Sequence, residues 1–105
     1  MNEEVQIEEF DWQRITIQVR FHPKRWKIYE ETYGYPLAHL EIQTINPKRV
    51  PLPITESGYL SHHLAPQDVE DEGGPAAYVR AWLDFAARFP NWQSKQEQSR
   101  QLDLF

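Results

Sequence analysis

The chain has 105 residues, of which 40% are hydrophobic, and it carries a formal net charge of −5. This length predicts one domain, and the negative charge disfavours a surface built as a whole to bind nucleic acid. The lack of cysteine excludes disulfides and thiolate metal sites. The acidic N-terminus does not resemble a signal peptide, and no apolar run reaches membrane-spanning length, so we expect a cytoplasmic protein without membrane contact.

Two strands are expected in the first half of the chain. Residues 1–11 carry five acidic residues and no basic one, which predicts an acidic, loosely held lead-in. From Arg14 to Phe21 apolar and polar residues then alternate strictly, a period of two that is typical of a strand with one buried face. A second strand is expected over 38–45, where Leu40 and Ile42 point inward, and it ends at residue 46 because a proline follows. One buried and one solvated face favour an antiparallel sheet.

The connection between these strands is ambiguous. In residues 23–35 the spacing of Trp26, Tyr29 and Tyr33 suits a helix, whereas the aromatic and β-branched content suits an irregular or strand-like connector. Both interpretations stay open, with a slight preference for the connector.

A single helix is expected in the second half. Prolines 51 and 53 force an extended segment that cannot lie inside a sheet, and residues 55–58 have turn chemistry. A helix is predicted over 75–89, with the acidic residues 70–72 just ahead of its positive N-terminal end. Its predicted core face consists of Tyr78, Val79, Trp82, Phe85, Ala86 and Phe89. This helix would cover the first strand, giving a small two-layer α+β domain over 12–92.

Residues 93–105 predict a flexible tail. Residues 93–100 contain no apolar side chain, as in a solvated linker, whereas the tail ends on Gln101, Leu102, Asp103, Leu104 and Phe105. Three large apolar side chains after a polar linker require a groove, either on this domain or on a partner. The alternative to partner binding is that the tail packs against its own domain.

These last five residues resemble the pentapeptide by which bacterial polymerases, mismatch-repair proteins and initiation regulators dock on the DNA polymerase III β sliding clamp. The consensus of that motif is Gln-Leu, then Ser or Asp, then Leu-Phe, and every position matches. The resemblance implies that Gln101 hydrogen-bonds at the rim of the clamp's cleft. It also implies that Leu102, Leu104 and Phe105 fill apolar subsites while Asp103 points outward. It covers five residues and implies nothing about the fold of the rest.

Two further candidate sites are weaker. One is the basic segment Lys24, Arg25, Trp26 and Lys27. Its aromatic ring could stack on the bases of single-stranded nucleic acid while the basic side chains neutralise phosphates, or the segment could be an ordinary basic loop. A polar loop over 55–63 could bind a ligand or carry enzymatic chemistry, or could be a structured turn: Thr55, Glu56, Ser57, Tyr59, His62 and His63.

A metal site is not predicted. Adjacent histidines such as His62 and His63 cannot both reach one ion from regular structure, and no metalloprotease or nucleophile-elbow motif is present. His22 and His39 lie on or near the predicted strands, and whether they approach one another stays open. The sequence thus predicts a non-enzymatic adaptor, without cofactor, that docks on the sliding clamp in bacterial DNA replication, repair or mobile-element maintenance.

Overall fold

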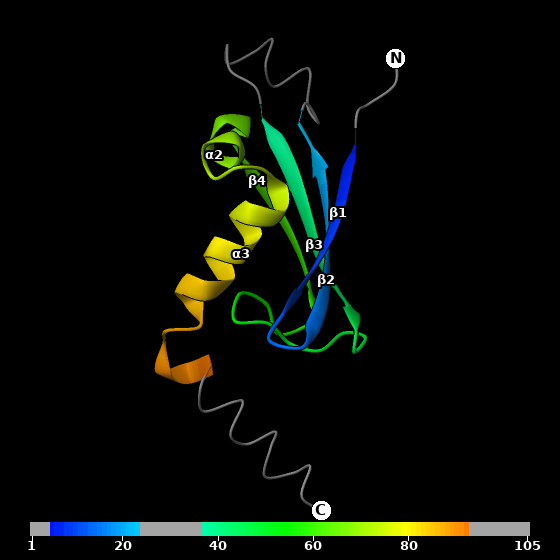
Figure 1. Cartoon of the computed structure of the whole chain (residues 1–105), viewed down its shortest axis with the longest axis vertical. Helices are drawn as coiled ribbons and strands as arrows, with labels where there is room; N and C mark the ends of the chain where they lie inside the picture. Colours follow the sequence, from blue (N-terminus) through cyan, green and yellow to red (C-terminus); the bar gives the residue numbers. More distant parts are fainter. Residues whose placement is uncertain (1–4, 24–36, 93–105) are drawn as a thin grey trace, which may run out of the picture.

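The computed structural model describes residues 5–23 and 37–92, and it confirms the predicted α+β fold (Figure 1). Four strands, β1 (Gln6–Trp12), β2 (Ile15–His22), β3 (Ala38–Asn46) and β4 (Tyr59–Leu64), lie in one antiparallel sheet in chain order. Helix α2 (Pro66–Asp71) packs against α3 (Pro75–Ala86), and α3 lies against β1 and β2. Among the described residues, no helix has the length and apolar character needed to cross a membrane.

The core lies between α3 and one face of the sheet. The period-two pattern of β2 buries its apolar side chains, and β3 supplies the next apolar row, as expected. Burying each such side chain stabilises the fold by about 1.5–3 kcal/mol. From these three elements the core takes Ile15, Ile17, Val19, Phe21, Ala38, Leu40, Ile42, Val79 and Leu83.

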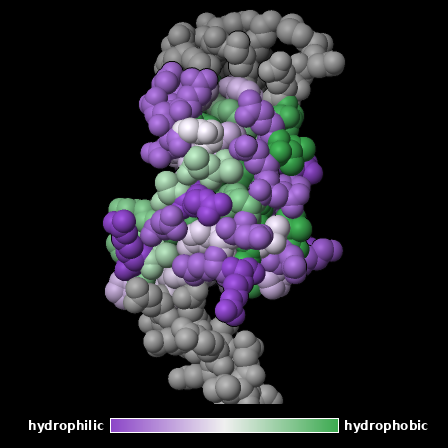
Figure 2. Space-filling view, viewed as in Figure 1, coloured by the Kyte–Doolittle hydropathy of each residue, from purple (hydrophilic) through white to green (hydrophobic). Residues whose placement is uncertain are grey.

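The expected loose lead-in over 1–11 is wrong from residue 6 onward, because this segment forms the edge strand β1. It pairs with β2 through a two-residue turn in which Gln13 and Arg14 have φ of 47° and 65°. A turn with two positive φ values matches the twist of a hairpin. Exposed acids such as Glu9 hide the strand pattern, and charged side chains also protect an exposed sheet edge from pairing. Figure 2 shows hydrophilic residues over much of the visible face, with hydrophobic surface along the β1 edge.

Two further elements were not predicted. Residues 59–64, expected within a loop, form β4, and the acidic segment around residue 70 forms most of α2. Strand β4 lacks β-branched residues, so only its pairing with β3 reveals it. Helix α2 starts at Pro66, a favoured first position, and is anchored by the buried side chain of Val69.

Helix α3 ends earlier than predicted, and part of its predicted core face is exposed. It stops at Ala86, and Phe85 and Phe89 are 58% and 54% exposed, so their assignment to the core is wrong. Val79 is buried as predicted, with Tyr78 and Trp82 packed against the core, and the unpredicted Leu83 is buried as well. The two phenylalanine rings contact each other edge to face. An apolar stripe this broad is wider than the face that the sheet covers, so the pattern alone does not decide which of its side chains are buried. An acid from β1 also caps its N-terminus, because the Ala76 N–H donates to Glu8 Oε1 at 2.9 Å.

The turn before β4 depends on glycine. Gly58 has φ of +77°, and its carbonyl accepts a hydrogen bond from the Thr44 N–H at 2.9 Å. A Cβ at this position would lie 2.5 Å from Thr44 Oγ1 and 2.8 Å from the backbone of Arg49. Both the backbone conformation and the lack of space therefore require glycine here.

Candidate functional site

The sheet face turned away from α3, which we call the outer face, carries a row of titratable side chains. The register places His22 opposite His39, and His39 opposite His63, on three adjacent strands. Glu41 lies between Arg20 of β2 and Ser61 of β4. Side chains alternate along a strand, so these residues share the face opposite to Leu40 and the other core side chains.

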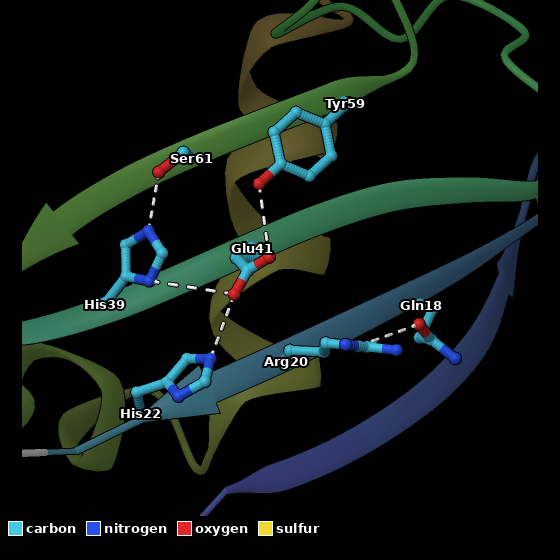
Figure 3. Close-up of polar contacts among 7 residues, drawn as sticks. All are labelled: Gln18, Arg20, His22, His39, Glu41, Tyr59 and Ser61. Carbon is cyan, nitrogen blue, oxygen red and sulfur yellow. Dashed lines mark hydrogen bonds and ion pairs between the residues drawn. The ribbon is translucent and has the colours of Figure 1, made fainter. Parts of the chain in front are cut away.

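Glu41 is the centre of this polar cluster (Figure 3). Its Oε1 atom lies 3.0 Å from His22 Nε2 and 3.8 Å from His39 Nδ1. Its Oε2 atom accepts a hydrogen bond from the Tyr59 hydroxyl at 3.2 Å. One carboxylate therefore contacts side chains from β2, β3 and β4.

His39 links Glu41 to β4. Its Nε2 atom is hydrogen-bonded to Ser61 Oγ, and its ring stacks on that of His63 with centroids 4.7 Å apart. His22 and His39 are each only 7% exposed although they lie on the outer face, and their ring centroids are 5.5 Å apart. Both imidazoles are therefore held in place by their surroundings.

The charges of the cluster are set by these contacts. Partial burial acts to raise the pKa of Glu41, but hydrogen bonds from His22 and Tyr59 and the nearby His39 oppose it, so the pKa is lowered overall. Burial, and then the hydrogen bond to Glu41, raise the pKa of Tyr59. At neutral pH the cluster thus contains an ionised carboxylate and a neutral phenol that donates to it.

Two kinds of chemistry fit this donor set to different degrees. Ser61, His39 and Glu41 follow the order of a nucleophile, a base and an orienting acid. The separation of 3.8 Å between His39 Nδ1 and Glu41 Oε1 is too long for the hydrogen bond that orients such a base. In contrast, the ligating atoms of His22, His39 and Glu41 all lie within 4.8 Å of one another, so these three residues could hold a metal ion.

The predicted ligand loop does not converge on one site. The Thr55 and Ser57 hydroxyls both donate to the Tyr59 carbonyl, at 2.8 Å and 3.0 Å, which is the structured-turn alternative. His62 and His63 belong to β4 and point to opposite faces, so they cannot share a ligand. Glu56 is an exposed residue of the turn.

His62 belongs to the core side of the sheet. Its ring lies 4.9 Å from that of Trp82 on α3, centroid to centroid. Burial, and then the neighbouring His63, lower its pKa. It is a packing residue rather than a partner of the outer-face cluster.

Two grooves lie beside the turn before β4. One of about 450 Å³ is lined by the turn before β4 and the chain that follows α3, including Leu52, Ile54, Phe89 and Trp92. The other, of about 440 Å³, lies beside Tyr59 and Arg49. Neither groove includes a residue of the histidine pair.

The remaining predicted site residues lie outside the described part of the chain. These are the basic segment 24–27 and the terminal pentapeptide 101–105. The cluster of His22, His39 and Glu41 was not selected from the sequence. The sequence did contain one indication of it. In two antiparallel strands joined by one connection, the end of the first lies beside the start of the second, which is where His22 and His39 stand.

Comparison with known proteins adds one relationship. Searches of curated proteins and of solved structures find no match to the chain. The family model described as the KlcB third domain matches residues 5–92, which includes every described strand and helix. The chain therefore belongs to the KlcB third-domain family.

Proposed function

We propose that this chain is a non-enzymatic adaptor or accessory protein that docks on the bacterial β sliding clamp through residues 101–105. Its place would be the cytoplasm, in DNA replication, repair or mobile-element maintenance. The observation that carries the proposal is the match of all five residues, Gln101 to Phe105, to the clamp-binding pentapeptide. The polar segment 93–100 supports it, because eight residues can reach up to about 25 Å when extended. The motif can then enter a cleft without any change in the folded domain.

The energetics of such a contact are those of a short peptide. Five residues bury only a few hundred Å² on a partner, so we expect about micromolar affinity rather than nanomolar. Most of the binding free energy would come from the apolar anchors, because a few buried side chains dominate small interfaces. Asp103 would contribute little, since Ser and Asp both satisfy the motif.

The test is a titration of purified bacterial β clamp with three ligands. These are the full chain, its Leu104→Ala/Phe105→Ala variant and a peptide of residues 93–105. The variant should lose about 2 kcal/mol or more of binding free energy, a factor of about thirty. The peptide should bind nearly as tightly as the full chain, and Asp103→Ser should leave the affinity almost unchanged.

A matched control separates the tail from the folded domain. The Phe85→Ala/Phe89→Ala variant removes two exposed aromatic side chains from the end of α3 and the segment after it. It should bind the clamp as tightly as the unaltered chain. Equal binding by the tail variant and the unaltered chain, or a loss confined to the Phe85/Phe89 variant, would refute docking through the tail.

A further inference from the structure

The outer face presents three metal-ligating atoms at the separations of a coordination shell. A tetrahedral ion with bonds of about 2.0–2.1 Å places its ligands roughly 3.4 Å apart. Glu41 Oε1 lies 3.0 Å from His22 Nε2 and 3.8 Å from His39 Nδ1, on either side of that value. The ligand atoms of the three residues lie within 4.8 Å of one another. Side-chain rotations that move these atoms by about 1 Å would therefore bring all three to bonding distance from one ion.

The other polar atoms of two of these ligands already have partners that would orient them. With His39 bound to an ion through Nδ1, its Nε2–H would donate to Ser61 Oγ, the atom that it contacts in the structure. With Glu41 bound through Oε1, its Oε2 keeps the hydrogen bond from the Tyr59 hydroxyl. Such outer partners fix the tautomer and the direction of a ligand, and they are a regular feature of protein metal sites.

The surroundings favour a cation in two respects and oppose it in one. The chain has a net charge of −5, and Glu41 brings a negative charge to the site. Arg20 lies beside Glu41 in the register, which disfavours a cation. Its Nε donates to Gln18 Oε1 at 3.4 Å, however, and Figure 3 shows the guanidinium directed toward Gln18 rather than over the carboxylate.

We propose that His22, His39 and Glu41 bind one divalent transition-metal ion of the zinc class. Two imidazoles and a carboxylate suit Zn²⁺, Co²⁺ or Ni²⁺, and the chain has no cysteine that would select a thiolate-bound ion. Three protein ligands leave a fourth position for water or for an atom of a partner. On binding, the ion takes the position between His22 Nε2 and Glu41 Oε1, and any proton held there is released to solvent. This inference does not depend on clamp docking.

The experiment is a calorimetric titration of the untagged full chain with ZnCl₂, paired with Co²⁺ absorption spectroscopy. We expect one ion per chain and the intense visible bands of low-coordinate Co²⁺. The variants Glu41→Gln, His22→Gln and His39→Gln should each weaken binding by ~100-fold or more, because losing a ligand costs at least as much as losing an outer partner. Ser61→Ala should weaken it by about tenfold, since it removes an outer partner only.

Two control variants change the same residue types away from the three ligands. Glu9→Gln lies on β1 at an exposed position and His62→Gln on the core side of β4, against Trp82, and neither should alter the affinity. Equal losses of Zn²⁺ affinity in the ligand variants and the control variants would show adventitious binding to the surface and would overturn the proposal. Failure of the unaltered chain to bind Zn²⁺ at about a tenfold molar excess would overturn it as well, whatever the variants do.

A measurement on the unaltered chain guards against variants that fail to fold. Zn²⁺ should shift the imidazole NMR signals of His22 and His39, while those of His62, on the other side of the sheet, stay in place. It should also raise the melting temperature, by roughly 11–22 °C at a hundredfold the dissociation constant. Shifts confined to His62, or an unchanged melting temperature despite binding, would contradict a site that joins β2 to β3.

Discussion

The side of α3 that faces the sheet can be tested by truncating two neighbouring side chains. Leu83 is fully buried in the core cluster, whereas Phe85, two residues later, is 58% exposed. Leu83→Ala removes a buried isobutyl group and leaves a cavity, and such changes cost about 3–5 kcal/mol in well-packed cores. Near the lower value, and at about 4–8 °C per kcal/mol for a domain of this size, the melting temperature should fall by roughly 12–24 °C.

Phe85→Ala is the matched control on the same helix. It removes a larger side chain but little buried surface, so its effect on the free energy of unfolding should stay within about 0.5 kcal/mol. Thermal and urea denaturation, followed by far-UV circular dichroism, measure both variants against the unaltered chain. Equal losses, or a larger loss for Phe85→Ala, would mean that Phe85 is buried against the sheet, and our account of the core would be wrong.

Two further predictions concern the turn before β4 and the core side of that strand. Gly58→Ala should destabilise the fold by more than about 2 kcal/mol, because positive φ and a close backbone contact oppose the new Cβ. Gly74→Ala, with φ of +124° but nothing within 4 Å, should cost less, and a reversed order in urea melts would refute the steric argument. The lowered pKa of His62 makes the unfolded chain bind its proton first, so stability should decline as the pH falls below about 6.5. His62→Gln should flatten this decline, and an unchanged slope between pH 7 and 5 would contradict it.

Sequence reasoning succeeded where burial is one-sided and regular. The alternation over Arg14 to Phe21 predicted β2 within a residue at each end, and Leu40 and Ile42 predicted the inner face of β3. It failed at the two edge strands, since β1 is largely exposed and β4 contains serine and histidine in place of β-branched residues. Edge strands acquire their structure from a neighbour, and that information is not local to their own residues.

The outer-face cluster escaped prediction for a related reason. Alternation along β2 and β3 already places His22, His39 and Glu41 on the polar side of the sheet. Which of them meet depends on the register between the strands, because a shift of one residue would move a histidine to the other face. In the structure His22 is paired with His39, so the three polar groups meet at one end of the sheet.

The two proposed ligands, the sliding clamp and a metal ion, would bind to different parts of the chain. The core face of the sheet is occupied by α3, so among the described residues the outer face, the grooves and the exposed pair Phe85 and Phe89 at the end of α3 remain available to a ligand. The terminal pentapeptide 101–105 is separated in sequence from the last described residue by the polar segment 93–100. Clamp docking and metal binding would therefore use different residues, and sites without shared partners are usually additive in free energy. If both proposals hold, Zn²⁺ should leave the affinity for the clamp unchanged, and Leu104→Ala/Phe105→Ala should leave the affinity for Zn²⁺ unchanged. A measured coupling between the two would require the tail to contact the outer face.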